Sequence, residues 1–208
     1  MNIAIVAGGK LQKRFFKKIR SADKIIGVDR GALWLVANKI LPDVAFGDFD
    51  SVTKKDLKII KQKVKKVIKY PQKKDATDLE LAVDYAISLK PKKVVIFGGI
   101  GTRLDHTIAA VHLLEKFLKK GIAGNVIDGK NKMTLVKDSH AVSRSPHHYV
   151  SILPFTPSIV ISLSGFAYPL TRKRLIRGTS RGISNVVIEK SAIIEVHEGI
   201  ALVIKSRD

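Results

Sequence analysis

The sequence contains no cysteine, and this absence excludes two kinds of stabilising site. Neither a disulfide framework nor a zinc site built on thiolates is possible. A chain of 208 residues does not need such cross-links, because at this size it can bury a substantial apolar core. Nothing in the cysteine content therefore points to an oxidising compartment.

Long hydrophobic runs are also missing at the amino terminus. The opening stretch "MNIAIVAGGKLQKRFF" has an apolar run at 3–7 that ends at two glycines and then meets charged residues. That run is too short for a signal peptide or a membrane span. We interpret it as a buried first strand and expect a cytoplasmic protein.

Acidic residues are scarce, with 18 Asp+Glu against 38 Lys+Arg and a formal net charge of +20. This balance favours anionic partners, and nucleic acid is among them. Aromatic residues make up only 6%, however, and no RNP-type or zinc-finger pattern is present. We therefore interpret most of the excess, which lies at 54–74 and at Arg172, Arg174, Arg177 and Arg181, as solvated surface, and expect neither a nucleic-acid nor a membrane partner.

Short β-branched runs alternate with helical patterns up to residue 128. We expect strands at 3–7, 24–28, 64–68, 94–97 and 125–127, and helices near 10–20, 30–38, 53–62, 77–89 and 104–119. This alternation is typical of an α/β fold with a mostly parallel, Rossmann-like sheet and helices on both faces.

The pattern changes near Asn131, where short alternating runs are broken by Gly, Pro, Asp and Ser. Such a pattern is typical of an all-β sandwich or barrel. The change falls within "VIDGKNK" at 126–132. We therefore expect an α/β domain at 1–129 and a smaller all-β domain at 130–208.

Two carboxylates one residue apart stand out in "AFGDFDS". In an extended segment, side chains two residues apart point the same way, so Asp48 and Asp50 could reach one cation. Carboxylate oxygens suit Mg²⁺, which fills the rest of its coordination shell with water or phosphate oxygens. An Asx-turn followed by a helix cap explains the same residues, and this pair alone does not decide between the two interpretations.

A second acidic cluster lies in "KDATDLELA". Thr77 and Glu80 have the spacing of a capping box, and Asp78 in the first turn would complement the helix dipole. A helix start explains these residues well and explains Asp75 less well. Both acidic clusters follow predicted strands, at the edge where open α/β sheets bind ligands.

A glycine-rich turn in "FGGIGTRLDH" forms the third candidate segment. Gly98, Gly99 and Gly101 would allow backbone N–H groups to approach an anion, and Arg103 adds a fork that suits phosphate. The dinucleotide fingerprint is absent, because Leu104 stands where its third glycine would be, and no Walker A motif occurs. Asp105 and His106 would begin the helix that follows.

In this order and spacing, "GDFDSV", "KDATDLELA" and "GTRLDHTIA" resemble the three signature segments of thiamine pyrophosphokinases. The segments "VSILPF", "SGFAYPL" and "GISN" resemble the thiamine-binding domain of the same family. The resemblance implies an Mg²⁺-dependent enzyme that transfers the pyrophosphoryl group of ATP to the hydroxyethyl oxygen of thiamine. The products would be thiamine diphosphate and AMP.

The resemblance also implies roles for individual residues. Asp48, Asp50 and Asp78 match the family's Mg²⁺-binding carboxylates. Arg103 would hold nucleotide phosphates, and Asp105 would lie beside the acceptor alcohol as a general base or an orienting group. The other expected nucleotide or thiamine contacts are Asp29, Lys74, Asp75, Gly98, Gly99, Gly101, Thr102, His106, Ser184 and Asn185. The family also implies a homodimer whose sites are shared between subunits.

Three positions depart from the family pattern. Thr102 stands where a glycine is common, and Ala110 where an asparagine is frequent, so the nucleotide side would be bulkier and less polar. Val186 replaces an acidic residue after "SN" and removes a possible partner for the thiamine ring. Two other functions therefore stay open: a pyrophosphokinase for another alcohol, such as a hydroxymethylpterin, or a basic nucleic-acid-binding protein.

Two aromatic residues precede Pro169 in the β region. Phe166 and Tyr168 could pack in the core or could flank a flat heterocycle, and the sequence leaves both readings open. A cationic thiazolium would gain from an aromatic face.

Overall fold

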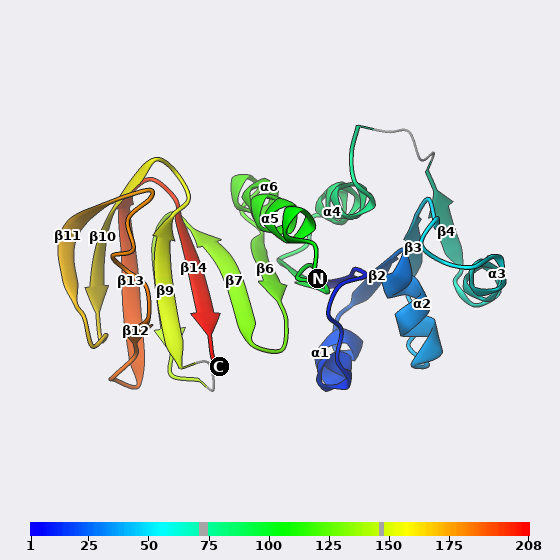
Figure 1. Cartoon of the computed structure of the whole chain (residues 1–208), viewed down its shortest axis with the longest axis horizontal. Helices are drawn as coiled ribbons and strands as arrows, with labels where there is room; N and C mark the ends of the chain where they lie inside the picture. Colours follow the sequence, from blue (N-terminus) through cyan, green and yellow to red (C-terminus); the bar gives the residue numbers. More distant parts are fainter. Residues whose placement is uncertain (71–74, 146–147) are drawn as a thin grey trace. The chain divides into compact units, whose positions relative to one another are not determined.

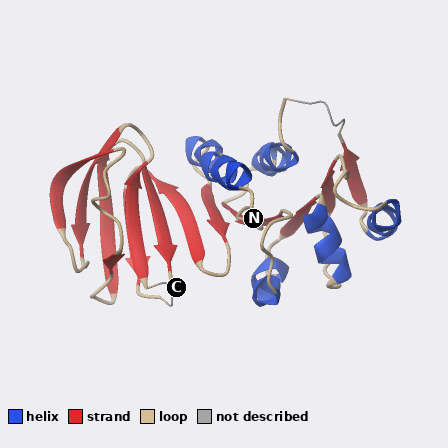
Figure 2. Cartoon of the chain, viewed as in Figure 1, coloured by secondary structure: helices blue, strands red, loops and turns tan. Residues whose placement is uncertain are grey.

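The computed structural model describes residues 1–70, 75–145 and 148–208, and the chain divides into two units, 1–129 and 130–208. The first unit contains helices and a parallel sheet, and the second contains only strands (Figures 1 and 2). Each unit has buried hydrophobic clusters of its own. The fold class expected from the sequence is confirmed.

The α/β unit comprises β1 (Asn2–Val6), η1 (Lys13–Phe15), α1 (Phe16–Arg20), β2 (Lys24–Val28), α2 (Arg30–Ala37), β3 (Val44–Gly47), α3 (Lys54–Lys63), β4 (Lys66–Lys69), α4 (Asp78–Ser88), β5 (Lys93–Phe97), α5 (Leu104–His112), α6 (Leu114–Lys119) and β6 (Ala123–Ile127). The strands pair in parallel in the order β6-β5-β1-β2-β3-β4. The chain moves outward from β1 to β4 and then restarts on the other side of β1 with β5. The topological switch point therefore lies between β1 and β5, where open α/β sheets bind ligands.

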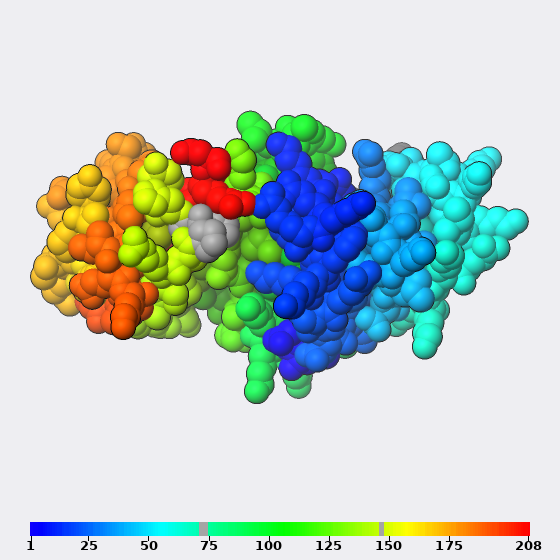
Figure 3. Space-filling view, turned by 90° about the horizontal axis from the view of Figure 1, so that it is seen from below, coloured from blue at the N-terminus to red at the C-terminus, as the bar shows by residue number. Residues whose placement is uncertain are grey.

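Helices cover both faces of this sheet. α1, α2 and α3 lie on one face, and α4, α5 and α6 lie on the other (Figure 1). This division follows from right-handed crossovers, because the strand order reverses direction after β4. Figure 3 shows the first of these faces, where the blue side chains of the amino-terminal segment cover the middle of the unit.

Some details of the α/β unit differ from the sequence-based expectation. The expected helix at 10–20 is the 3-10 helix η1 followed by the short helix α1 at Phe16–Arg20. β3 was not predicted, because "VAFG" is only four residues long and ends in glycine. The expected helix at 104–119 is two helices, α5 and α6, separated at Leu113. β3 matters for function, because Asp48 directly follows it.

The β unit comprises β7 (Asn131–Val136), β8 (Ser139–Ser143), β9 (Tyr149–Pro154), β10 (Ser158–Ser164), β11 (Leu170–Ile176), β12 (Asn185–Val186), β13 (Ser191–Glu198) and β14 (Ala201–Ser206). Its strands form two antiparallel layers, β12-β9-β14-β7 and β11-β10-β13-β8. Residues such as Ile152, Ile161 and Ile194 fill the core. β11 was not predicted, because five of its seven residues are exposed and no apolar alternation marks it.

None of the helices that the structure describes is long and apolar enough to cross a membrane.

Candidate active site

Most of the candidate residues of the α/β unit lie at one edge of its sheet. Asp29 follows β2, Asp48 follows β3, and a glycine-rich loop that ends at Arg103 follows β5. Asp78 is the first residue of α4, and Thr77 caps this helix by accepting the Glu80 N–H at 3.2 Å, as predicted. Because all the strands are parallel, their carboxyl ends share this edge.

Three carboxylates come together there. One oxygen of each of Asp29, Asp48 and Asp78 lies within 4.8 Å of the others, and all three residues are half-buried. The family resemblance had assigned Asp48, Asp50 and Asp78 as metal ligands and had placed Asp29 only among the nucleotide or thiamine contacts. The structure adds Asp29 to the cluster.

The backbone around Asp29 is built to hold its side chain in this position. Asp29 has a φ of 46°, a conformation that non-glycine residues seldom adopt. The Phe49 N–H donates to Asp29 Oδ1 at 3.3 Å, and a Cβ at Gly47 would collide with the same oxygen. Gly47 therefore leaves room for the carboxylate, and an unusual backbone conformation at a cluster of charges is typical of a functional site.

The electrostatics of the cluster are unfavourable without a cation. Burial raises the pKa of the Asp29 carboxyl to about 7, and the charge of Asp78 acts in the same direction. The Phe49 N–H opposes this rise, whereas the charges of Asp48 and Asp50 add to it. Hard oxygen donors that crowd together and repel one another are a donor set that fits Mg²⁺.

Asp50 does not lie where strand geometry had placed it. Phe49 has a φ of 59°, so the segment is not extended, and the expectation that Asp48 and Asp50 point the same way on that ground is wrong. The Asp50 N–H donates to Asp48 Oδ1 at 3.0 Å, which is the Asx-turn weighed as the alternative. Asp50 remains electrostatically close to the cluster, because its charge acts on Asp29.

The glycine-rich loop after β5 packs against the loop after β1. The Gly9 N–H donates to the Gly98 carbonyl at 2.9 Å, and the Lys10 N–H donates to the Ile100 carbonyl at 2.8 Å. Sequence reasoning missed this second loop, although "AGGK" directly after a strand was an available signal. The two loops meet at the switch point between β1 and β5.

Gly98 and Gly99 of this loop allow close packing against neighbouring atoms. A Cβ at Gly99 would lie 3.3 Å from Ala110 Cβ, so Ala110 is buried beneath the loop and not on the surface that would face a nucleotide. The Gly101 N–H donates to Thr107 Oγ1 at 3.3 Å. Of the two departures from the family pattern on this side, Ala110 affects the packing beneath the loop. Thr102 lies on the exposed surface.

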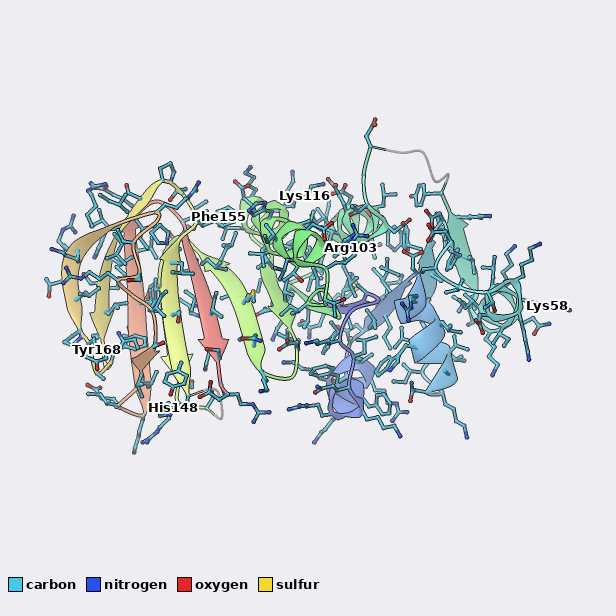
Figure 4. All side chains as sticks on the ribbon, in the orientation of Figure 1. Lys58, Arg103, Lys116, His148, Phe155 and Tyr168 are labelled. Carbon is cyan, nitrogen blue, oxygen red and sulfur yellow. The ribbon has the colours of Figure 1, made fainter. Side chains whose placement is uncertain are left out.

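Arg103, labelled in Figure 4, forms an exposed ion pair with Asp105 at the start of α5. Arg103 donates from Nε to Asp105 Oδ1 at 3.3 Å and from a terminal nitrogen to Oδ2 at 2.6 Å. The guanidinium, with help from the His106 N–H, holds the pKa of Asp105 below its usual range. A carboxylate held in this way is a weak base.

The remaining predicted residues fall in different surroundings. Asp75 is exposed ahead of α4, His106 is exposed in the first turn of α5, and Lys74 lies outside the described residues. In the β unit, Ser184 is exposed with a φ of 59°, whereas Asn185 is 2% exposed. Phe166 belongs to the core of this unit, so packing explains it.

We expect the raised pKa of Asp29 to make the stability of the metal-free protein depend on pH. The pKa is about 7 in the folded chain against an ordinary value of 3.8, so between these values the folded state holds the proton more tightly. The resulting stabilisation is complete below 3.8 and is lost as the pH rises through 7. The thermal midpoint of the parent should fall about 4 °C further than that of Asp29→Asn between about pH 5.5 and 8. Equal pH dependence of the two proteins would contradict this assignment.

Most of the chain matches the domains of one known protein family. Residues 15–124 match the family described as "Thiamin pyrophosphokinase, catalytic domain". Residues 139–201 match "Thiamin pyrophosphokinase, vitamin B1 binding domain". The acidic cluster and the glycine-rich loop fall in the first match, and Ser184 and Asn185 fall in the second.

Individual relatives agree with this match. A thiamine pyrophosphokinase of Bacillus subtilis (strain 168) is 34% identical over 186 residues, which are 88% of this chain and 87% of that protein. A crystal structure of thiamine pyrophosphokinase from Bacillus subtilis superimposes with a TM-score of 0.93 at 32% identity over 100% of both chains. A thiamin pyrophosphokinase structure from Geobacillus thermodenitrificans gives 0.87 at 33% identity, covering 100% of this chain and 98% of that one.

Proposed function

This chain belongs to the thiamin pyrophosphokinase family, and from that premise we propose that it transfers the pyrophosphoryl group of ATP to the hydroxyethyl oxygen of thiamine. The observation that carries the proposal is the cluster of Asp29, Asp48 and Asp78 at the carboxyl edge of the sheet. It lies within the part of the chain that matches the catalytic domain. The products are thiamine diphosphate and AMP.

The chemistry needs positive charge more than a covalent nucleophile. Attack of the alcohol on the β-phosphorus builds negative charge on the oxygens around two phosphoryl groups. Asp29, Asp48 and Asp78 would hold Mg²⁺, with Asp50 close enough to act on the same cluster. When bound, the ion supplies the positive charge that offsets both the carboxylates and the polyphosphate.

Arg103 would exchange partners when the nucleotide arrives. Its guanidinium is exposed, and a bidentate contact with Asp105 is the geometry that it would offer to a phosphate. Once Arg103 turns to phosphate, Asp105 loses the contact that lowers its pKa. The freed carboxylate would then accept a hydrogen bond from the thiamine hydroxyl. We assign Asp105 an orienting role, because a loose transition state needs little help from a base.

The assembly we propose is a homodimer with shared sites. The acidic cluster belongs to the α/β unit, whereas the match to the vitamin B1 binding domain covers the β unit. A two-fold dimer can build each site from the α/β unit of one subunit and the β unit of the other. A cytoplasmic location is part of the proposal, because ATP is the phosphoryl donor.

The alternatives considered from the sequence are less well supported. A nucleic-acid-binding protein leaves the acidic cluster unexplained, and the family match gives it no support. A pyrophosphokinase for a hydroxymethylpterin would share the phosphate chemistry, but the match to a vitamin B1 binding domain favours thiamine.

The experiment that tests the proposal is incubation with ATP, Mg²⁺ and thiamine, followed by separation of the nucleotides. We expect AMP and thiamine diphosphate in equal amounts and no ADP, because the β-phosphorus is attacked. A parallel incubation with hydroxymethylpterin in place of thiamine should give no AMP above background. Stoichiometric ADP together with thiamine monophosphate would overturn the assignment.

A further inference from the structure

Lys116 joins two helices that lie on the same face of the α/β sheet. Its side chain, labelled in Figure 4, extends from α6 to two carboxylates of α4. Lys116 Nζ donates to Glu80 Oε1 at 2.8 Å and to the two carboxylate oxygens of Asp84 at 2.9 and 3.0 Å. These contacts join residues 36 and 32 positions apart in sequence. The network therefore ties α4 to a helix that the chain reaches only after β5 and α5.

A neighbouring ion pair shows what is unusual about this network. Lys119 and Glu115 form a pair at 2.9 Å, but both belong to α6, so their contact holds no other element in place. Lys116 is less exposed, at 36% against 68% for Lys119, and two carboxylates share it. Burial alone would lower the pKa of Lys116, but its hydrogen bonds to Asp84 and Glu80 outweigh this effect and raise the pKa. Isolated surface pairs contribute little to stability, whereas a shared and partly buried contact between two helices can fix their positions.

The network is attached to the helix that begins with a carboxylate of the acidic cluster. Asp78 is the first residue of α4, and Glu80 follows it in the same turn. One oxygen of Asp78 lies within 4.8 Å of an oxygen of each of Asp29 and Asp48. A shift of the first turn of α4 would therefore move Asp78 relative to the other two carboxylates.

The packing of α4 on the sheet relies mostly on short side chains. Its buried residues are Ala82, Val83 and Ala86, and Tyr85 adds a ring contact with Phe46 at 5.1 Å between centroids. Short side chains make fewer van der Waals contacts than long ones, so they resist a sideways shift of a helix less firmly. The ammonium of the α6 lysine adds a lateral contact to the first two turns of α4, where Asp78 lies.

We propose that Lys116 is a positioning residue for the cation site, and that it sets the place of Asp78 in the acidic cluster by holding α4 against α6. This inference rests on the proposed function, because it takes the acidic cluster to be the Mg²⁺ site. The geometry of such a site must be held to within about 0.5 Å, so a small shift of α4 weakens it.

Position and charge predict opposite effects when Lys116 is lost. Removing a positive charge near the cluster leaves more negative charge there and strengthens cation binding. Losing the tether moves Asp78 away from its partners and weakens cation binding. The sign of the change in cation affinity therefore separates a positioning role from a purely electrostatic one.

The test is Mn²⁺ binding to the nucleotide-free protein, followed by the electron paramagnetic resonance signal of the free ion. Lys116→Met, which keeps a long apolar side chain but removes the ammonium, should bind Mn²⁺ about fivefold more weakly than the parent. Lys116→Arg, which can bridge the same carboxylates, should stay within about twofold. Unchanged or tighter binding by Lys116→Met would overturn the positioning role.

Lys119→Met is the matched control. It removes the same charge from the same helix and leaves the contact between α6 and α4 intact. Its affinity for Mn²⁺ should equal or exceed that of the parent, because only the electrostatic effect remains. If Lys119→Met weakens binding as much as Lys116→Met does, the tether is not the cause and the proposal fails.

The Mg²⁺ dependence of turnover gives a second readout. The Mg²⁺ concentration for half-maximal AMP formation should rise about fivefold in Lys116→Met, whereas kcat at saturating Mg²⁺ should stay within about twofold. A general disturbance of the fold would lower kcat at every Mg²⁺ concentration, and that result would contradict the proposal. Circular dichroism checks that the variants fold.

These outcomes separate the inference from the proposed function. If the parent binds Mn²⁺ and forms AMP from ATP and thiamine, and Lys116→Met binds Mn²⁺ equally well, only the positioning role fails. If the parent binds no Mn²⁺ and forms no AMP, the proposed function fails and the positioning role fails with it.

Discussion

Replacing Asp48 by asparagine should lower turnover at least a hundredfold and leave the protein folded. The change keeps the size of the side chain but removes the charge of one of the three carboxylates in the acidic cluster. A lost charge at a catalytic cation site costs several kcal/mol of transition-state stabilisation. The measurement is AMP formation at saturating ATP, thiamine and Mg²⁺, with circular dichroism as the check on folding.

Two further variants sharpen this test. Asp138→Asn removes a carboxylate from an exposed turn of the β unit and should leave activity unchanged, so it controls for the loss of charge as such. Asp50→Asn keeps the backbone N–H that forms the Asx-turn, so a loss of activity would show that the Asp50 carboxylate shares the cation with Asp48, as the family resemblance implies. Activity of Asp48→Asn within about threefold of the parent would make Asp48 a structural residue.

The layout of the fold could be predicted because each unit has its own periodicity. The alternation of apolar runs and helical patterns predicted the parallel sheet, and the predicted strand at 24–28 coincides with β2. β3 and β11 were not predicted, and the reasons are opposite. β3 is short and buried, so it carries no alternation, whereas β11 is mostly exposed and charged. Such strands are specified by their neighbours in the sheet and not by their own sequence.

The acidic cluster could be predicted only in part. Asp48 and Asp78 lie in local patterns that suggest a function, but nothing in "GVDRG" marks Asp29 as their neighbour. Asp29 reaches the cluster because β2 lies beside β3 and because Gly47 leaves space for its carboxylate. Both features depend on the tertiary structure and cannot be seen in the sequence. The predicted direction of the Asp50 side chain was wrong for a local reason. The left-handed backbone of Phe49 could not be inferred from its residue type.

The roles of the β-unit residues also depend on burial that the sequence does not display. "GISN" suggests two polar residues that could meet a ligand, yet Ser184 is exposed and Asn185 is buried. The two hydrogen bonds between Asn185 and Tyr168 join residues 17 positions apart in sequence. The spacing of residues along the sequence does not predict a contact of this kind between two loops.

Mixed dimers should show that each active site is shared between subunits. We expect the Asp48→Asn chain and the Ser184→Ala/Asn185→Ala chain to be nearly inactive as separate homodimers. The first lacks a carboxylate of the cluster, and the second lacks two polar side chains within the match to the vitamin B1 binding domain. Asn185 is buried, so circular dichroism checks that the second chain folds. If it does not fold, Ser184→Arg, at an exposed residue, takes its place.

The two variants would be co-expressed with different affinity tags, and the mixed dimer isolated by two successive purifications and confirmed by mass. In a two-fold dimer with shared sites, one site then combines the intact α/β unit of one chain with the intact β unit of the other. The second site carries both lesions. The mixed dimer should therefore regain about half of the parental activity by symmetry. Sites built within single subunits would leave one lesion in each site and no recovery, and a protein from which no mixed dimer can be isolated would equally sink the shared-site proposal.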